Sequence, residues 1–249
     1  GKEAVMEKKP SSWLDFTKTI FWAIVIAVLF RSFLFEPFSI PSGSMIPTLR
    51  VGDYLFVSKY SYGYSRYSFP FGVIPIKDRV WRGEPEYGDV VVFRRPGNEG
   101  VDYIKRLVGK PGDRIQVIDS ILYINGQQMP RVEYSLDPSD PAAADPAVEA
   151  FMETLPNGRE YVIFERMDKP YPLSNNTREF LVDAGHYFFM GDNRDRSNDS
   201  RMSVGNVPEK NLIGRAEFLF FSHNGNARIW ELWKWPSAIR FSRIGMGIN

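Results

Sequence analysis

Residues 115–127, IQVIDSILYINGQ, contain the pattern that decides the fold class. Two short apolar runs, at 115–117 and 121–124, are rich in β-branched residues, which favour strands. Asn125-Gly126 follows the second run and is a strong signal for a two-residue hairpin, because a type I′ turn needs positive φ at both of its central positions. The stretch therefore predicts short β-strands joined by a tight turn.

The same pattern recurs outward from this stretch in both directions. Short apolar runs bounded by Gly, Pro, Asp and Asn occur at 54–57, 90–93 and 103–104. Such runs are typical of an all-β chain. Between residues 50 and 220 there is no extended helical periodicity, and no glycine-rich nucleotide-binding motif occurs. The body of the chain is therefore predicted to be mainly β.

Composition excludes several kinds of chemistry. The chain has 249 residues, a formal net charge of +1, no cysteine and two histidines. The absence of cysteine removes thiol nucleophiles, thiolate metal sites and disulfides. The near-neutral charge and the lack of a basic stripe with stacking aromatics argue against nucleic-acid binding. A histidine triad or a histidine metal site would have to use His186 or His223, and we expect no metal and no cofactor.

Residues 19–35, TIFWAIVIAVLFRSFLF, form the only strongly apolar run. A membrane span takes about 20 such residues. Arg31 lies near the far end, where its side chain can reach the interface. Lys2, Lys8 and Lys9 precede the run, which places the N-terminus in the cytoplasm and the rest of the chain outside. No small-x-small cleavage site follows, so we interpret residues 1–35 as an uncleaved anchor in a lipid bilayer; the alternative is a buried or interfacial helix.

Residues 41–48, PSGSMIPT, come shortly after the anchor. Each proline fixes its own φ. The residue before each proline is biased towards an extended conformation. Ser44 is therefore presented on a stiff, bent backbone. An ordinary Ser/Gly/Pro turn is the alternative.

A second unusual stretch is YIKRLVG at 103–109, where Lys105 follows an apolar residue in a strand-like run. A single lysine in a strand is commonly a solvated edge residue. If Lys105 is buried instead, desolvation lowers its pKa. A neutral lysine amine can deprotonate a serine hydroxyl, and serine with lysine is a known variant of the catalytic triad that needs no histidine.

The third stretch is GDNRDRSNDSR at 191–201, next to an apolar run at 187–190. Its alternating charges and small polar residues predict a hydrogen-bonded loop at the end of a strand. Ser197 could hold the lysine amine, and Asp199 with Arg201 could form a structural ion pair. The alternative is a solvated turn.

Together, in this order, the three stretches resemble the bacterial signal peptidase I (leader peptidase) family of Ser/Lys endopeptidases. The resemblance includes RSF at 31–33, EPF at 36–38 and GDVVVF at 88–93. It extends over residues 31–57, 87–117 and 185–220, more than a third of the chain. It implies a membrane-anchored serine endopeptidase that removes N-terminal signal peptides from exported preproteins by cutting after an A-x-A-type site.

The resemblance also implies individual roles. Ser44 would be the nucleophile and Lys105 the general base. The oxyanion hole would comprise the Ser44 N–H and the Ser42 hydroxyl, and Ser197 would orient Lys105. Asp199 and Arg201 would give structural support. Two shallow substrate pockets would be formed by Phe38, Ile40, Met45, Leu49 and Ile104, together with Tyr103, which with Phe93 and Met190 would also cover the lysine stem.

The family fold implies a largely antiparallel catalytic β domain, residues 36–117 plus 185–249, with an extended flap at 58–82. A variable β insertion would occupy 118–184, and its proline-rich part, 131–178, is predicted to be loop-rich and outside the core. The enzyme would lie in the bacterial inner (cytoplasmic) membrane as a single-pass protein, with its catalytic domain on the periplasmic or external side.

Three alternatives remain open from the sequence. One is another Ser/Lys endopeptidase, such as a self-cleaving repressor, although an apolar anchor stands where a DNA-binding domain would be expected. Another is a membrane-anchored β module that binds exported peptides without cutting them. The third is a histidine triad that uses His186 or His223.

Overall fold

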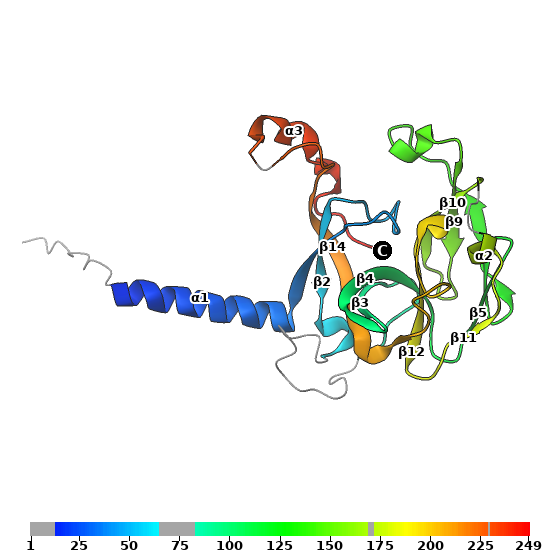
Figure 1. Ribbon diagram of the computed structural model, residues 1–249, viewed down its shortest axis with the longest axis horizontal. Helices are drawn as coiled ribbons and strands as arrows, with labels where there is room; N and C mark the ends of the chain where they lie inside the picture. Colours follow the sequence, from blue (N-terminus) through cyan, green and yellow to red (C-terminus); the bar gives the residue numbers. More distant parts are fainter. Residues whose placement is uncertain (1–12, 65–82, 169–171, 229) are drawn as a thin grey trace, which may run out of the picture.

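A computed structural model describes residues 13–64, 83–168, 172–228 and 230–249. One long helix is followed by antiparallel β-sheets, which confirms the mainly β fold with an N-terminal apolar helix (Figure 1). The helices are α1 (Trp13–Phe33), α2 (Pro172–Asn175) and α3 (Trp235–Ala238). The strands are β1 (Phe35–Ser39), β2 (Asp53–Ser58), β3 (Val90–Arg95), β4 (Asn98–Gly109), β5 (Arg114–Ile118), β6 (Ile121–Ile124), β7 (Gln127–Gln128), β8 (Arg131–Glu133), β9 (Val148–Thr154), β10 (Glu160–Arg166), β11 (Phe180–Leu181), β12 (His186–Met190), β13 (Val207–Pro208) and β14 (Leu212–Ser222).

Helix α1 projects away from the sheets as an isolated rod (Figure 1). Its 21 residues correspond to about 32 Å, enough to cross the hydrocarbon core of a bilayer. Ser32 is its only buried residue. Arg31 in the last turn pairs with Glu36 at 2.7 Å. The helix is thus long and apolar enough to span a membrane. It ends at Phe33, two residues before the end of the apolar run, and Phe35 begins β1.

A seven-stranded sheet, in the order β1-β2-β14-β3-β4-β12-β13, forms the larger part of the molecule. Side chains alternate between its two faces, as the pleat of a strand requires. On β3, Val90 and Val92 pack in one apolar cluster, and Val91 and Phe93 pack in another. The sheet is therefore buried on both faces, which explains the near-continuous apolar run at 90–93.

Two smaller sheets, β11-β5-β6-β7 and β10-β9-β8, lie at the end of the molecule away from α1 (Figure 1). One apolar cluster joins them to the large sheet, since it includes Leu122 of β6, Ile163 of β10 and Phe188 of β12. The predicted hairpin is confirmed between β6 and β7, where Asn125 and Gly126 have φ of 54° and 76°.

The prediction that 131–178 is loop-rich and outside the core was wrong. The segment contains β8, β9 and β10, and Tyr161 and Ile163 are buried in the core. The prolines and aspartates that suggested a loop are concentrated at 137–146, just before β9. The strands β8 and β9 lie on either side of this loop and pair with each other.

The structure differs from the sequence prediction near residue 118 and at the start of the predicted flap, 58–82. Strand β5 begins at Arg114 and pairs with β6 and β11, so the four-stranded sheet starts before the predicted boundary at 118. The division into domains remains a prediction. Within the predicted flap, Tyr60–Tyr62 forms a short 3-10 helix rather than an extended ribbon, and residues 65–82 lie outside the described residues.

Candidate active site

Ser44 lies in the loop between β1 and β2. The base of the loop is closed by hydrogen bonds from the Ile40 N–H to the Asp53 carbonyl, at 2.9 Å, and from the Gly52 N–H to the Ile40 carbonyl, at 3.1 Å. Met45, the next residue after Ser44, is buried in the apolar cluster beneath the loop. Ser44 itself is 7% exposed. Its backbone is therefore fixed from both sides, as the proline-framed sequence predicted.

Lys105 lies in the middle of β4, opposite Val91 of β3. It is 5% exposed, so the alternative of a solvated edge lysine does not hold. Its Nζ lies 2.6 Å from the Ser44 Oγ and donates a hydrogen bond to the Ile104 carbonyl at 3.0 Å. The Tyr103 ring centroid is 5.3 Å from the same nitrogen. The fold thus brings a serine hydroxyl from the β1–β2 loop and a lysine amine from β4 into direct contact.

Burial lowers the pKa of Lys105 from its usual value of 10.5 to about 8, because a desolvated ammonium is disfavoured. The negative charges of Asp199 and Asp192 act in the opposite direction and limit the shift. About a tenth of the amine is therefore neutral at pH 7 and can accept the proton of the serine hydroxyl.

Two hydrogen-bond donors lie beside the Ser44 hydroxyl. The Ser42 Oγ is 3.4 Å from the Ser44 Oγ. Within the described part of the chain, the backbone N–H of Ser44 donates to no recorded partner. Both donors are thus available to an oxygen atom that develops negative charge near Ser44.

The loop at 191–201 is a buried polar network. The Gly191 N–H donates to Asp199 Oδ2 at 2.9 Å, and Asp199 pairs with Arg201 at 2.9 Å. Arg201 also donates to the Arg194 carbonyl at 2.7 Å. Burial by itself would raise the pKa of Asp199, but the charge and hydrogen bonds of Arg201 outweigh it and hold the pKa low. Asp199 therefore stays ionised and keeps the loop closed.

This loop also holds the backbone of Ser44. The Asn193 N–H donates to the Ser44 carbonyl, and the Asn193 side-chain amide donates to the Gly43 carbonyl, both at 3.0 Å. A Cβ on Gly191 would lie 2.6 Å from the Ser44 carbonyl oxygen and would overlap the Ser197 side chain. Only glycine at position 191 therefore allows this close approach.

Ser197 lies beside Gly191 and the Ser44 carbonyl, but the predicted hydrogen bond from Ser197 to the Lys105 amine is not seen. The Ser197 Oγ is buried, and it lies close enough to the Asp199 carboxylate to help keep the pKa of Asp199 low. The recorded hydrogen bonds of the Lys105 amine are with Ser44 and the Ile104 carbonyl. An orienting role for Ser197 stays a prediction.

The predicted pocket and support residues fall into three apolar clusters. Phe38, Ile40, Met45, Leu49 and Ile104 share the cluster beneath the Ser44 loop. Tyr103 and Phe93 lie together in a second cluster, with ring centroids 6.2 Å apart. Met190 packs in the third cluster, with the smaller sheets, and not with Phe93 and Tyr103. The structure thus brings the first five residues together next to Ser44.

An ion pair between Arg106 and Asp192 was not identified from the sequence. Arg106 donates to both oxygens of Asp192, at 2.9 and 2.8 Å, and both side chains are 1% exposed. The Arg106 guanidinium also lies 4.1 Å from the centroid of the Tyr161 ring. Arg106 follows Lys105 and Asp192 precedes Asn193, so the pair ties together the two segments that flank the Ser44–Lys105 contact. Adjacency to Lys105 was the only sequence signal for it.

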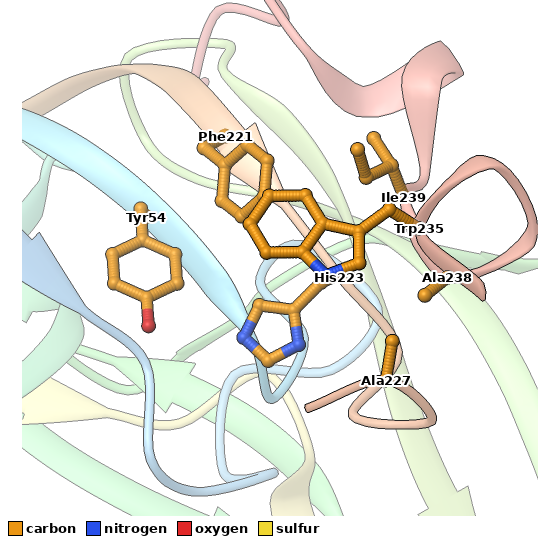
Figure 2. A pocket seen from close by; sticks show the side chains of 7 residues that line it. All are labelled: Tyr54, Phe221, His223, Ala227, Trp235, Ala238 and Ile239. Atoms are coloured by element: carbon orange, nitrogen blue, oxygen red, sulfur yellow. The ribbon is translucent and has the colours of Figure 1, made fainter. Parts of the chain in front are cut away.

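Neither histidine is placed to serve the Ser44–Lys105 pair. His223 lies in an apolar pocket of about 240 Å³ with Tyr54, Phe221 and Trp235 (Figure 2). The His186 Nδ1 lies 2.9 Å from the Ala184 carbonyl. Neither ring has a recorded hydrogen bond to Ser44 or Lys105. Among the described residues, no group of three or more His, Asp and Glu side chains could hold a metal ion.

Comparison with known proteins supports an assignment to a family. The family model described as "Signal peptidase, peptidase S26" matches residues 13–221. A signal peptidase I from Rickettsia typhi is 44% identical over 238 residues, covering 90% of this chain and 89% of that protein. One from Rickettsia massiliae is 47% identical over 207 residues, covering 81% and 77%.

Among solved structures, a signal peptidase I from Enterococcus faecalis is 29% identical, with a TM-score of 0.31, and covers 53% of this chain and 96% of that one. The family model and the Rickettsia relatives each extend over most of the chain, and the residues matched by the family model include the Ser44 loop, β4 and the 191–201 loop. The chain therefore belongs to the signal peptidase I family, peptidase S26.

Proposed function

We propose that this protein is a membrane-anchored serine endopeptidase that removes signal peptides from exported preproteins, cutting after an A-x-A-type site with a Ser44–Lys105 dyad. Membership of the family supports signal-peptide removal by a peptidase. The observation that carries the dyad is the 2.6 Å distance between Lys105 Nζ and Ser44 Oγ, with the pKa of that amine lowered to about 8.

The neutral amine of Lys105 takes the Ser44 proton as the Oγ attacks the carbonyl carbon of the scissile peptide bond. The tetrahedral intermediate collapses when the Lys105 ammonium gives its proton to the departing amine, which is the new N-terminus of the mature protein. An ester between Ser44 and the signal peptide remains. Lys105 then deprotonates a water molecule, which hydrolyses the ester and restores the serine.

The developing oxyanion accepts hydrogen bonds from the Ser44 N–H and the Ser42 hydroxyl. Removing one such donor in a serine protease slows turnover by about 10²–10³-fold. The apolar cluster containing Ile40, Met45 and Ile104 forms shallow pockets for the small residues at the first and third positions before the cut, the A-x-A pattern.

Helix α1 anchors the enzyme in the bacterial inner membrane, with the N-terminus in the cytoplasm and the sheets on the periplasmic or external side. The length and apolar composition of residues 13–33 support a membrane-spanning anchor. A signal peptide lies in the same bilayer, so enzyme and substrate are confined to one plane and meet at a high effective concentration.

The proposal is tested by incubating the full-length protein in detergent or lipid with a preprotein that carries an A-x-A site. We expect wild type to cut at that site and the Ser44→Ala variant to lose turnover, because the variant has no nucleophile. N-terminal sequencing of the product locates the cut, and circular dichroism checks that both proteins are folded. A folded but inert wild type would contradict the proposal and would favour a module that binds exported peptides.

Turnover should also rise with pH. The reacting form of Lys105 is the neutral amine, and with a pKa of about 8 roughly a tenth of it is neutral at pH 7 and roughly nine tenths at pH 9. We therefore expect kcat to increase about tenfold between these values and then level off, measured with a peptide substrate at constant ionic strength. A rise centred near pH 6.5 would indicate a histidine base instead.

A further inference from the structure

A groove of about 220 Å³ opens beside Ser44, between the Ser44 loop and the sheet β10-β9-β8. Ile46 and Asn193 line the groove on the side of the nucleophile. Asn193 donates hydrogen bonds to the backbone carbonyls of Ser44 and Gly43, each at 3.0 Å. The groove therefore begins next to the backbone of the nucleophile.

The groove is separate from the apolar cluster assigned above to the residues before the cut. Met45 points into that cluster, whereas Ile46, the next residue, lines the groove. The two sites share no residue. A polypeptide bound across Ser44 continues on both sides of the scissile bond. If the apolar cluster holds the residues before the cut, the groove is the adjacent site available to the residues after it.

The lining of the groove combines apolar side chains with guanidinium groups. Val148 of β9 and Phe164 of β10 contribute apolar surface. Arg50, Arg166 and Arg196 also line it, together with the carboxylate of Asp145, so positively charged groups outnumber negative ones in the lining. Such a lining suits a side chain with an apolar stem and a negatively charged end.

Two of these arginines already have carboxylate partners. Arg50 pairs with Asp140 at 2.5 Å, and Arg166 pairs with Asp145 at 2.9 Å. Arg196 is exposed and has no ion pair within the described residues. A carboxylate that enters the groove can therefore pair with Arg196, whereas an ammonium group is repelled by it.

We propose that this groove receives the first residues of the mature protein, after the cut, and that Arg196 makes an acidic side chain preferred there over a basic one. The inference rests on the proposed signal-peptide cleavage. It adds Arg196 as a specificity-determining residue for the part of the substrate after the cut.

The test uses the full-length enzyme in detergent and a set of preproteins that share one A-x-A site. Each of the first three residues after the cut is changed singly to Glu, Ser or Lys. Pairs of substrates compete in one reaction, so the product ratio gives the ratio of their kcat/KM values. Wild type is compared with Arg196→Glu and with the control Arg178→Glu, which reverses an exposed arginine outside the groove.

At one or more of the three positions we expect wild type to prefer Glu to Lys by about 3–5-fold, as for an exposed ion pair. Arg196→Glu should shift this ratio towards Lys by about tenfold, because attraction is replaced by repulsion, and Arg178→Glu should leave it unchanged. If the Glu-to-Lys ratio of kcat/KM is the same in wild type and in folded Arg196→Glu at all three positions, the inference is overturned. Cleavage of the Ser substrates would in that case leave the proposed function intact. If wild type cuts none of the substrates, the proposed function itself fails.

Photo-crosslinking gives an independent readout that does not depend on turnover. A photoreactive residue is placed either two residues after or two residues before the cut in a preprotein bound to full-length Ser44→Ala. The residue after the cut should label the groove segments 141–148, 164–166 or 193–196, and the residue before it should label β1 or β4. Labelling of the groove segments only from the position before the cut would assign the groove to the signal peptide and contradict the inference.

Discussion

Replacing Lys105 by methionine is expected to lower kcat by about 10²–10⁴-fold, the contribution of a positioned general base. Methionine keeps an unbranched apolar stem of similar length in the buried site on β4 but has no group that can accept the Ser44 proton. The measurement is single-turnover cleavage of an A-x-A preprotein by full-length protein, at pH 9, where the wild-type amine is neutral. Because Lys105 is 5% exposed and its charged form is disfavoured by burial, the variant should fold at least as well as wild type.

The matched control is the double variant His186→Gln/His223→Gln. Neither ring is hydrogen-bonded to Ser44 or Lys105, and His223 lies in the aromatic pocket beside Trp235 (Figure 2). We expect this variant to keep most of the wild-type turnover. A folded Lys105→Met variant that still cuts at the wild-type rate would place the base elsewhere. Loss of turnover in a folded double-histidine variant would have the same consequence.

The second large effect is expected on stability. Replacing Asp192 by asparagine should lower the free energy of unfolding by about 3–5 kcal/mol, the usual cost of removing one partner of a buried ion pair. Arg106 donates to both oxygens of Asp192 and is 1% exposed, so its charge would remain buried without a counter-ion. Urea denaturation of full-length protein in detergent, followed by tryptophan fluorescence and circular dichroism, measures the change.

Glu179→Gln provides the comparison for an exposed pair. Glu179 pairs with Arg114 at 2.7 Å, but the two side chains are 44% and 60% exposed. Glu179→Gln should lower the free energy of unfolding by less than about 1 kcal/mol, because water screens the charges of the exposed pair. If Asp192→Asn and Glu179→Gln destabilise the protein equally, the Arg106–Asp192 pair does not hold the fold around the site.

Features that depend only on residues close together in the sequence could be predicted from the sequence alone. The apolar run ending near Phe35 predicted a helix, and α1 ends two residues earlier, at Phe33. Asn125 and Gly126 predicted the hairpin between β6 and β7, because positive φ is a property of the residues themselves. The strands at 53–58, 90–95 and 121–124 followed from short, β-branched apolar runs. The prediction for 131–178 was wrong because the prolines and aspartates of one loop, at 137–146, are not typical of the whole segment, which contains β8, β9 and β10.

The Ser44, Lys105 and 191–201 stretches were recognised from the sequence, together with the family they resemble. Their contacts were not predictable in the same way. Whether Lys105 is a solvated edge residue or a buried amine depends on which strands flank β4, and these are β3 and β12. The 2.6 Å contact with Ser44 therefore requires the large sheet to be assembled.

The sequence by itself determined the strand and helix types, the apolar anchor and the chemical groups of the site, because each depends on local conformational preference and side-chain chemistry. Only the tertiary structure decided which of those groups are buried and paired. Arg106 meets Asp192 across 86 residues of chain. Arg196 lies at a groove formed by four separate segments and forms no ion pair with any residue that the structure describes. Burial and ion pairing are properties of the folded surroundings, so the lowered pKa of Lys105 could be inferred only once those surroundings were known.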